Sequence, residues 1–152
     1  MRTGSGPRLV DANVWLALLA PSHEHHAPVR DWYDTLEAGQ AGLCRLVHLA
    51  VIRLLSNPKV MGPSVITTRE AWDVLDSLMD DERVEMWAEP AGLAGVMPKL
   101  LRYPVPTPNM VTDAYLAAFA IARECRLATI DGGFDQFAGL RVERLAAAVM
   151  AG

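Results

Sequence analysis

The sequence has few cysteines, no long apolar run and no excess of basic residues, and each lack excludes a class of protein. Its two cysteines, Cys44 and Cys125, form neither a C-x-x-C pair nor a dense framework, so we expect free thiols in a reducing compartment. The longest early apolar stretch, from Val14 to Pro21, is far shorter than the ~20 residues that a membrane span needs. No basic leader precedes it, so we expect no export signal, no membrane partner and a cytoplasmic location.

The formal net charge is −4, which argues against a nucleic-acid binder that works by bulk positive charge. This net charge still allows a basic lip, meaning a local group of cations beside the site. Arg8, Arg45, Arg53, Lys59 and Arg102 could form it. The chain has 152 residues, of which 51% are hydrophobic, and it shows neither a repeat nor a linker. We therefore expect one globular domain over residues 1–152.

Short apolar runs alternate with helical patterns along the whole chain. Strands are predicted at residues 9–10, 43–46, 84–88 and 127–130, with a fifth at 140–145. Helices are predicted at 14–19, 25–38, 47–56, from Thr67 or Thr68 to 79, at 92–101, and from Pro108 to about 123 with Thr107 as its N-cap. Gly39 and Gly42 are expected to end the second helix. This alternation predicts an α/β fold, with a parallel central sheet of four to five strands and helices on both faces.

Two of the predicted strands run directly into an acid. Asp11 follows the first strand and Asp131 follows the fourth, while Asp113 lies near the start of the long helix between 107 and 126. Ligands of such sheets bind outside the carboxyl ends of the strands, so these three acids are expected to converge. Thr129 shares a strand face with Asp131, and Asn109 lies four residues before Asp113, on the same face of the expected helix.

Three converging carboxylates repel one another unless a proton or a cation lies between them. Oxygen-only ligands suit Mg²⁺ or Mn²⁺, and such an ion can acidify a bound water and neutralise a phosphoryl oxygen. The pattern therefore favours a metal site that hydrolyses phosphodiester bonds.

Four segments carry a resemblance to a known family. "LVDANVWLAL", "NMVTDAYLAAFA" and "LATIDGGFDQF" resemble the signature segments of PIN-domain ribonucleases, and "RLLSNPKV" resembles the VapC toxins of bacterial toxin–antitoxin pairs. The resemblance implies a PIN-like three-layer domain and a Mg²⁺- or Mn²⁺-dependent endoribonuclease. It also implies homodimers and inhibition by a cognate VapB-type antitoxin.

The same resemblance assigns roles to residues. Asp11, Asp113 and Asp131 match the catalytic, metal-binding acids, Asn13 and Thr129 match supporting polar groups, and Asp135 is a further candidate acid. The sequence departs from the family pattern at Ala50, where many PIN nucleases carry a glutamate. Asp80, Asp81 and Asp135 are candidates to replace that acid.

Several other polar residues have competing interpretations. His23, His25 and His26 lack the i, i+4 spacing of a helical zinc pair, so we expect no metal there. His48 is expected to pack rather than to act as a base, whereas Arg53 fits an RNA contact, an antitoxin contact or an ion pair equally well. The acids between residues 73 and 85 are expected to form a solvated face.

The leading hypothesis is hydrolysis of RNA, most readily of single-stranded loops, because a duplex hides its base edges. One alternative is a catalytically weak module that binds RNA or antitoxin through the "LAVIRLL" helix. Another is a phosphatase or phospho-acceptor domain with Asp11 as nucleophile. The absence of any lysine after Lys99 counts against that second alternative.

Overall fold

The computed structural model of the protein describes residues 6–101 and 108–145. Within them, five strands form one sheet in the order β3-β2-β1-β4-β5. The strands are β1 (Arg8–Val10), β2 (Ala41–Leu43), β3 (Val84–Met86), β4 (Arg126–Thr129) and β5 (Val142–Arg144). All four neighbouring pairs are parallel, which confirms the predicted fold class.

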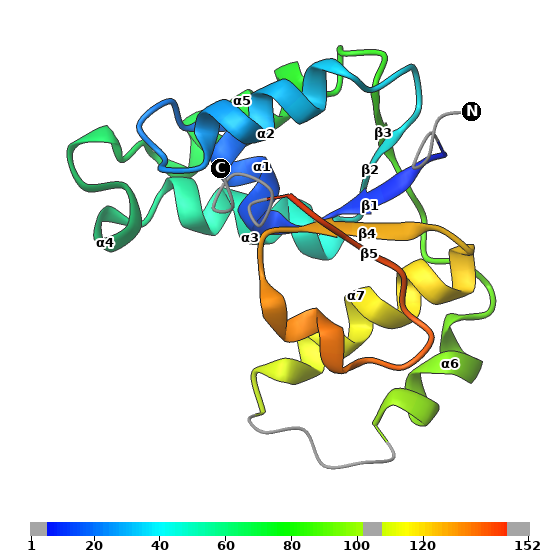
Figure 1. The fold of residues 1–152 in the computed structure, drawn as a ribbon. Coiled ribbons are helices and arrows are strands. Elements are labelled where there is room, and N and C mark those ends of the chain that lie inside the picture. The colour runs from blue at the N-terminus through cyan, green and yellow to red at the C-terminus, as the bar shows by residue number, and fades with distance from the viewer. Residues whose placement is uncertain (1–5, 102–107, 146–152) are drawn as a thin grey trace.

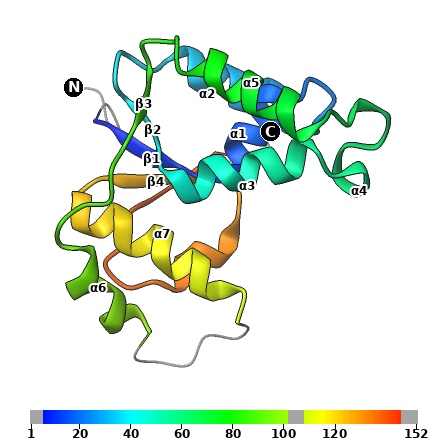
Figure 2. The same ribbon diagram turned by 180° about the vertical axis from the view of Figure 1, so that it is seen from behind.

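Helices cover both faces of this sheet, as parallel strands require. The described α-helices are α1 (Ala12–Leu19), α2 (His26–Asp34), α3 (Arg45–Leu55), α4 (Pro58–Met61), α5 (Thr68–Leu78), α6 (Leu93–Leu100) and α7 (Met110–Arg123). Figure 1 shows α1, α2, α3 and α5 on one side of the sheet and α6 and α7 on the other, and the reverse view in Figure 2 agrees. Two 3₁₀ turns, η1 (Gly62–Ser64) and η2 (Gly132–Gln136), complete the described elements. In the part of the chain that is described, no helix is long and apolar enough to cross a membrane.

The second strand corrects the sequence-based prediction. It occupies Ala41–Leu43 rather than 43–46, and α3 already begins at Arg45. Gly42 therefore lies inside the strand instead of ending a helix, and a Cβ at this position would overlap the ring of Trp87. Close packing against an aromatic ring thus explains the glycine, which the prediction attributed to helix termination.

Other boundaries also differ from the prediction. Helix α2 ends at Asp34, four residues earlier than expected, and Gly39 adopts a positive φ of 73° in the turn before β2. The short helix α4 was not predicted, and the Asn57 side chain caps it by accepting a hydrogen bond from the Lys59 N–H over 2.9 Å. Helix α7 begins at Met110, while Pro108 lies in the preceding turn. The predicted cap Thr107 lies outside the described residues.

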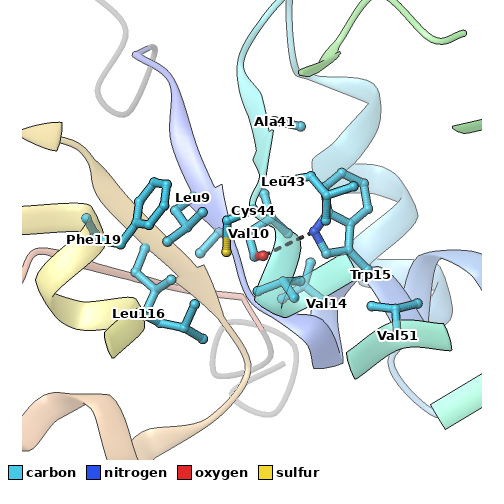
Figure 3. Close-up of a cluster of buried hydrophobic side chains, with 14 of the residues drawn as sticks. Leu9, Val10, Val14, Trp15, Ala41, Leu43, Cys44, Val51, Leu116 and Phe119 are labelled. Carbon is cyan, nitrogen blue, oxygen red and sulfur yellow. Dashed lines mark hydrogen bonds between the residues drawn. The ribbon is translucent and has the colours of Figure 1, made fainter. Parts of the chain in front are cut away.

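The core lies on both sides of β1, the middle strand. Leu9 and Val10 are fully buried, and Figure 3 shows them between Phe119 of α7 and Trp15 of α1. The Trp15 indole N–H donates a buried hydrogen bond of 3.1 Å to the Val10 carbonyl oxygen. Helix α1 is thereby fastened to the end of β1 immediately before Asp11.

Candidate active site

The end of β1 and the end of β4 bring the first two acids together. Val10 pairs with Ala128, and the Asp11 N–H donates a 2.9 Å hydrogen bond to the Ala128 carbonyl oxygen. Asp11 then caps α1, because its Oδ1 accepts a 2.7 Å hydrogen bond from the Ala12 N–H. Asp131 caps η2 in the same way, with Oδ1 accepting from the Gly133 N–H at 2.9 Å.

The Thr129 hydroxyl connects these two acids. It donates to Asp11 Oδ2 over 2.9 Å and accepts a 3.0 Å hydrogen bond from the Asp131 N–H. Thr129 is completely buried, so these contacts exclude solvent and fix the hydroxyl in place. Its position fits a residue that holds the acids rather than one that touches a substrate.

The third acid, Asp113, lies in the first turn of α7. Burial raises the pKa of Asp113, and the nearby carboxylate of Asp131 raises it further. Burial likewise raises the pKa of Asp11, to about 6, with smaller contributions from Asp113 and Asp131 in the same direction. The hydrogen bonds from Thr129 and Ala12 oppose this rise. The three predicted acids therefore lie close enough together to repel one another.

This set of acids fits a hard divalent cation. The available ligands are carboxylate oxygens, and the raised pKa of Asp11 means that its buried negative charge is poorly compensated within the protein. As the side chains lie, no three His, Cys, Asp or Glu residues of the described chain are arranged to hold one ion together. Mg²⁺ commonly takes only one or two carboxylates and retains several waters, so it does not need direct contact with all three acids.

The residues predicted to support the acids behave differently from one another. Asn13 is exposed on the first turn of α1, and its side chain makes no hydrogen bond within the described residues. Asn109 is the N-cap of α7, with helical backbone angles but no side-chain capping bond, four residues before Asp113. Asp135 is exposed and pairs with Arg144 over 2.7 Å. Of these three, only Asn13 retains a free polar group next to Asp11.

Arg144 is a site residue that the sequence reasoning missed. It ends β5 opposite Thr129, and its Nη1 lies 3.6 Å from where a Cβ on Gly132 would stand. The Nε of Arg144 is buried and has no hydrogen-bond partner within the described residues. A positive charge therefore lies beside the turn that carries Asp131. The sequence does not point to it, because Arg144 reaches the site only through the pairing of β5 with β4.

The predicted basic lip is only partly assembled. Arg8 is buried and donates from Nε to Glu143 at 3.0 Å, so it is not available to RNA. Arg53 and Lys59 are exposed at the far end of α3 and on α4, while Arg45 begins α3 next to the end of β2. Arg102 lies outside the described residues. Arg45 and Arg144 thus lie at the carboxyl ends of β2 and β5.

The structure also decides between the interpretations of other polar residues. Asp81 lies before the amino end of β3, where it accepts hydrogen bonds from Tyr33 and Arg83. Together with its neighbour Asp80 it is at the wrong edge of the sheet to replace the acid missing at Ala50, and Asp81 departs from the predicted solvated face. His48 is 4% exposed and packs edge-on against Trp72, as expected.

The histidines near the start of α2 have structural contacts. His26 Nδ1 lies 2.8 Å from the Ala17 carbonyl oxygen, which connects α2 to α1. His23 Nδ1 accepts a hydrogen bond of 3.0 Å from the His25 N–H. The His26 contact thus connects α2 to α1, and the His23 contact lies within the turn between them.

Comparison with known proteins agrees with the fold. The sequence matches the model of the PIN domain family over residues 8–140, a range that includes Asp11, Asp113 and Asp131. The chain belongs to the PIN-domain family. The resemblance inferred from the sequence is confirmed, and the VapC ribonucleases are among the relatives.

Two curated PIN-domain relatives cover most of the chain. Ribonuclease VapC41 of Mycobacterium tuberculosis is 38% identical over 143 residues, which are 91% of this chain and 98% of that protein. Ribonuclease VapC29 of the same species is 33% identical over 131 residues, which are 86% and 90% of the two chains.

Solved structures of the family share the fold at low sequence identity. DNA-bound VapBC from Salmonella typhimurium matches with a TM-score of 0.67 at 15% identity, over 92% of this chain and 98% of that one. VapC20 of Mycobacterium tuberculosis, described as a toxin that cleaves the sarcin-ricin loop, matches with a TM-score of 0.60 at 17% identity. That match covers 88% of this chain and 98% of the VapC20 chain.

Proposed function

We propose that this chain is a single PIN-like domain acting as a metal-dependent endoribonuclease toxin. The observation that carries the proposal is the meeting of Asp11, Asp113 and Asp131 at the carboxyl edge of the sheet, in a chain 38% identical to a named ribonuclease. The repulsion among these acids supports a requirement for Mg²⁺ or Mn²⁺. When bound, such an ion would acidify a water molecule and neutralise charge on the phosphate.

Each residue of the site has a separate task in this proposal. Asp11, Asp113 and Asp131 would hold the ion, directly or through its bound waters, and the Thr129 hydroxyl keeps Asp11 and Asp131 in register through its two hydrogen bonds. Asn13 offers an amide next to Asp11 to a phosphate oxygen or a water. Arg144 reduces the net negative charge that an RNA backbone meets at the turn after β4. RNA is cleaved by water, without a covalent intermediate on the enzyme.

The proposed partners follow from the relatives. Several matching solved structures are VapBC complexes, including one from nontypeable Haemophilus influenzae, which supports a VapB-type antitoxin as inhibitor of this chain. A homodimer and a cytoplasmic location are part of the same proposal. Arg53 is exposed and unpaired within the described residues, so it remains a candidate contact for RNA or antitoxin.

The decisive test is cleavage of total cellular RNA by purified, antitoxin-free protein. We expect discrete products with Mg²⁺ or Mn²⁺ that disappear with chelator and in Asp11→Asn or Asp131→Asn. The control is Glu82→Asn, which replaces an exposed acid at the opposite edge of the sheet. This variant should cleave RNA as the wild type does. Folded wild-type protein that leaves RNA intact with both metals would contradict the proposal and favour a module that binds RNA or antitoxin without cleaving.

A further inference from the structure

A hollow of about 480 Å³ lies beside the three acids and has no role in the chemistry described above. We call it the β2–β3 hollow, because residues directly after β2 and β3 line it. Cys44 and Arg45 come from the end of β2, Trp87 and Glu89 from the segment after β3, and Tyr115 from α7. Its size suits a small planar ligand.

Strand pairing places this hollow next to the active site. Leu9 pairs with Gly42 and Leu43 pairs with Met86, so Asp11, Cys44 and Trp87 follow one another across the carboxyl edge of the sheet. Burial raises the pKa of the Cys44 thiol, and the carboxylate of Asp11 adds to that rise, which agrees with their proximity. A nucleotide adjoining a phosphate at the acids therefore has the β2–β3 hollow within reach.

The walls of the hollow are aromatic. Trp87 is only 4% exposed and is held between Gly42 of β2 and the Arg123 guanidinium, which lies 3.7 Å from the ring centroid. Tyr115 is half-buried and packs edge-on against Phe119. The accessible ring is thus that of Tyr115, and an unpaired RNA base can stack on such a ring.

Two opposite charges line the same hollow without pairing. Arg45 donates from Nη1 to His48 Nδ1 at 3.2 Å, and Glu89 Oε1 accepts a 2.9 Å hydrogen bond from the Tyr115 hydroxyl. Within residues 6–101 and 108–145, no ion pair joins Arg45 to Glu89. The unshared Oε2 of Glu89 and the free guanidinium nitrogens of Arg45 are thus left for a ligand with donors and an acceptor on one edge.

We infer that the β2–β3 hollow binds an unpaired guanine of the RNA substrate. The guanine N1–H and N2–H groups are adjacent donors that match the Glu89 carboxylate, and its O6 accepts from Arg45. Adenine offers one donor group at the corresponding edge, and inosine lacks the N2 amine. This inference rests on the proposed function, since it assigns the base next to the cleaved phosphate.

Binding without cleavage tests the inference separately from the nuclease activity. The probes are fluorescently labelled uridine 12-mers with one central guanosine, adenosine or inosine, titrated with intact protein in chelator. We expect the guanosine oligonucleotide to bind about tenfold more tightly than the adenosine one, with inosine between them. In Glu89→Gln the guanosine and inosine affinities should agree within about twofold, because the N2 amine loses its carboxylate partner, whereas Glu82→Gln, the matched control, should keep the wild-type order.

Each outcome decides a different claim. Equal affinity of wild-type protein for the three probes, or no binding, would overturn the guanine site even if the protein cleaves RNA. A preference for guanosine over inosine that persists in Glu89→Gln would overturn its assignment to the β2–β3 hollow. A preference lost in Glu89→Gln, in a protein that never cleaves RNA with metal, would leave the guanine site standing and contradict the proposed function.

Discussion

The Thr129 hydroxyl donates a 2.9 Å hydrogen bond to Asp11 Oδ2, and these residues are 118 positions apart in the chain. The same oxygen accepts from the Asp131 N–H, so one buried side chain fixes the distance between two acids from different strands. Neither contact needs a metal. The protein therefore holds part of its site in place before any ion or RNA binds.

Replacing Thr129 with valine should separate the effect of its two hydrogen bonds from the effect of its packing. Valine fills nearly the same space but leaves Asp11 Oδ2 and the Asp131 N–H without a partner, so we expect the free energy of unfolding to fall by about 1–3 kcal/mol. RNA cleavage should fall about 10- to 100-fold, as for other residues that orient metal ligands. Thermal unfolding and cleavage rates with Mg²⁺ measure the two effects.

Thr129→Ser is the matched control, because it keeps the hydroxyl and removes only a methyl group. We expect it to retain cleavage within a few fold of the wild type. If Thr129→Val cleaved as fast as Thr129→Ser, the hydroxyl would have no part in orienting the acids.

The raised pKa of Asp11 predicts how pH affects the metal-free protein. Its pKa rises from 3.8 in an unstructured chain to about 6 in the fold, so the folded state holds this proton more tightly. The tighter hold on this proton adds to the free energy of unfolding. That addition is complete below about pH 4 and is lost as the pH rises to about 6. In chelator, the free energy of unfolding of the wild type should fall relative to that of Asp11→Asn between about pH 4 and 6. Above about pH 6 the difference between the two proteins should no longer change with pH.

Adding metal should raise the stability of the wild type relative to Asp11→Asn. Above pH 6, Mg²⁺ or Mn²⁺ should raise the melting temperature of the wild type and leave that of Asp11→Asn nearly unchanged, because a ligand that binds only the folded state stabilises it. Urea unfolding at several pH values and melting curves with each ion measure these effects. Equal stabilisation of both proteins by metal would show that the ion binds elsewhere.

A pair of glycine substitutions tests the packing of Trp87. Gly42→Ala should destabilise the protein by about 1–3 kcal/mol, because the added methyl group overlaps the Trp87 ring inside the sheet. Gly95→Ala is the control, since a methyl group added at this position on α6 would have no neighbouring atom within 4 Å. It should leave stability unchanged or raise it by up to about 1 kcal/mol. Similar melting temperatures for both variants would contradict the described packing.

Asp81 predicts a second pH effect, of opposite sign. Hydrogen bonds from Arg83 hold the pKa of Asp81 well below its ordinary value, and Arg83 lies 4.1 Å over the ring of Tyr33. Asp81→Asn should therefore cost about 1–3 kcal/mol at pH 7. That loss should shrink as the pH falls below about 4, where the wild-type contact also weakens. Asp80→Asn, at an exposed neighbour, should change stability by less than about 0.5 kcal/mol at any pH.

The sequence predicted the fold class well because hydrophobic periodicity reports which elements form. It misplaced β2 because Gly42 looks like a helix stop, whereas only the distant Trp87 explains a glycine inside that strand. Helix α4 escaped prediction because four residues are too few to show a helical period. In both cases the missing information is a contact or a cap that composition does not encode.

The sequence pointed to the three acids because two of them directly follow strands and the third lies in the first turn of a helix. Their mutual effects on pKa agree with the predicted convergence. Their surroundings were not predictable. Arg144 reaches the site only through the pairing of β5 with β4, and Arg8 is withdrawn from the surface by Glu143 on that same strand. The charges around the acids therefore depend on strand order rather than on local sequence.

The central position of β1 has a consequence for the order of folding. This strand pairs with β2 on one side, but its other neighbour, β4, begins at Arg126 and is synthesised more than one hundred residues later. A growing chain thus presents Asp11 long before Thr129 and Asp131 exist to complete the site. Because such distant pairings form slowly, we expect the site to be assembled late in folding, after the local helices and the β1–β2 pair.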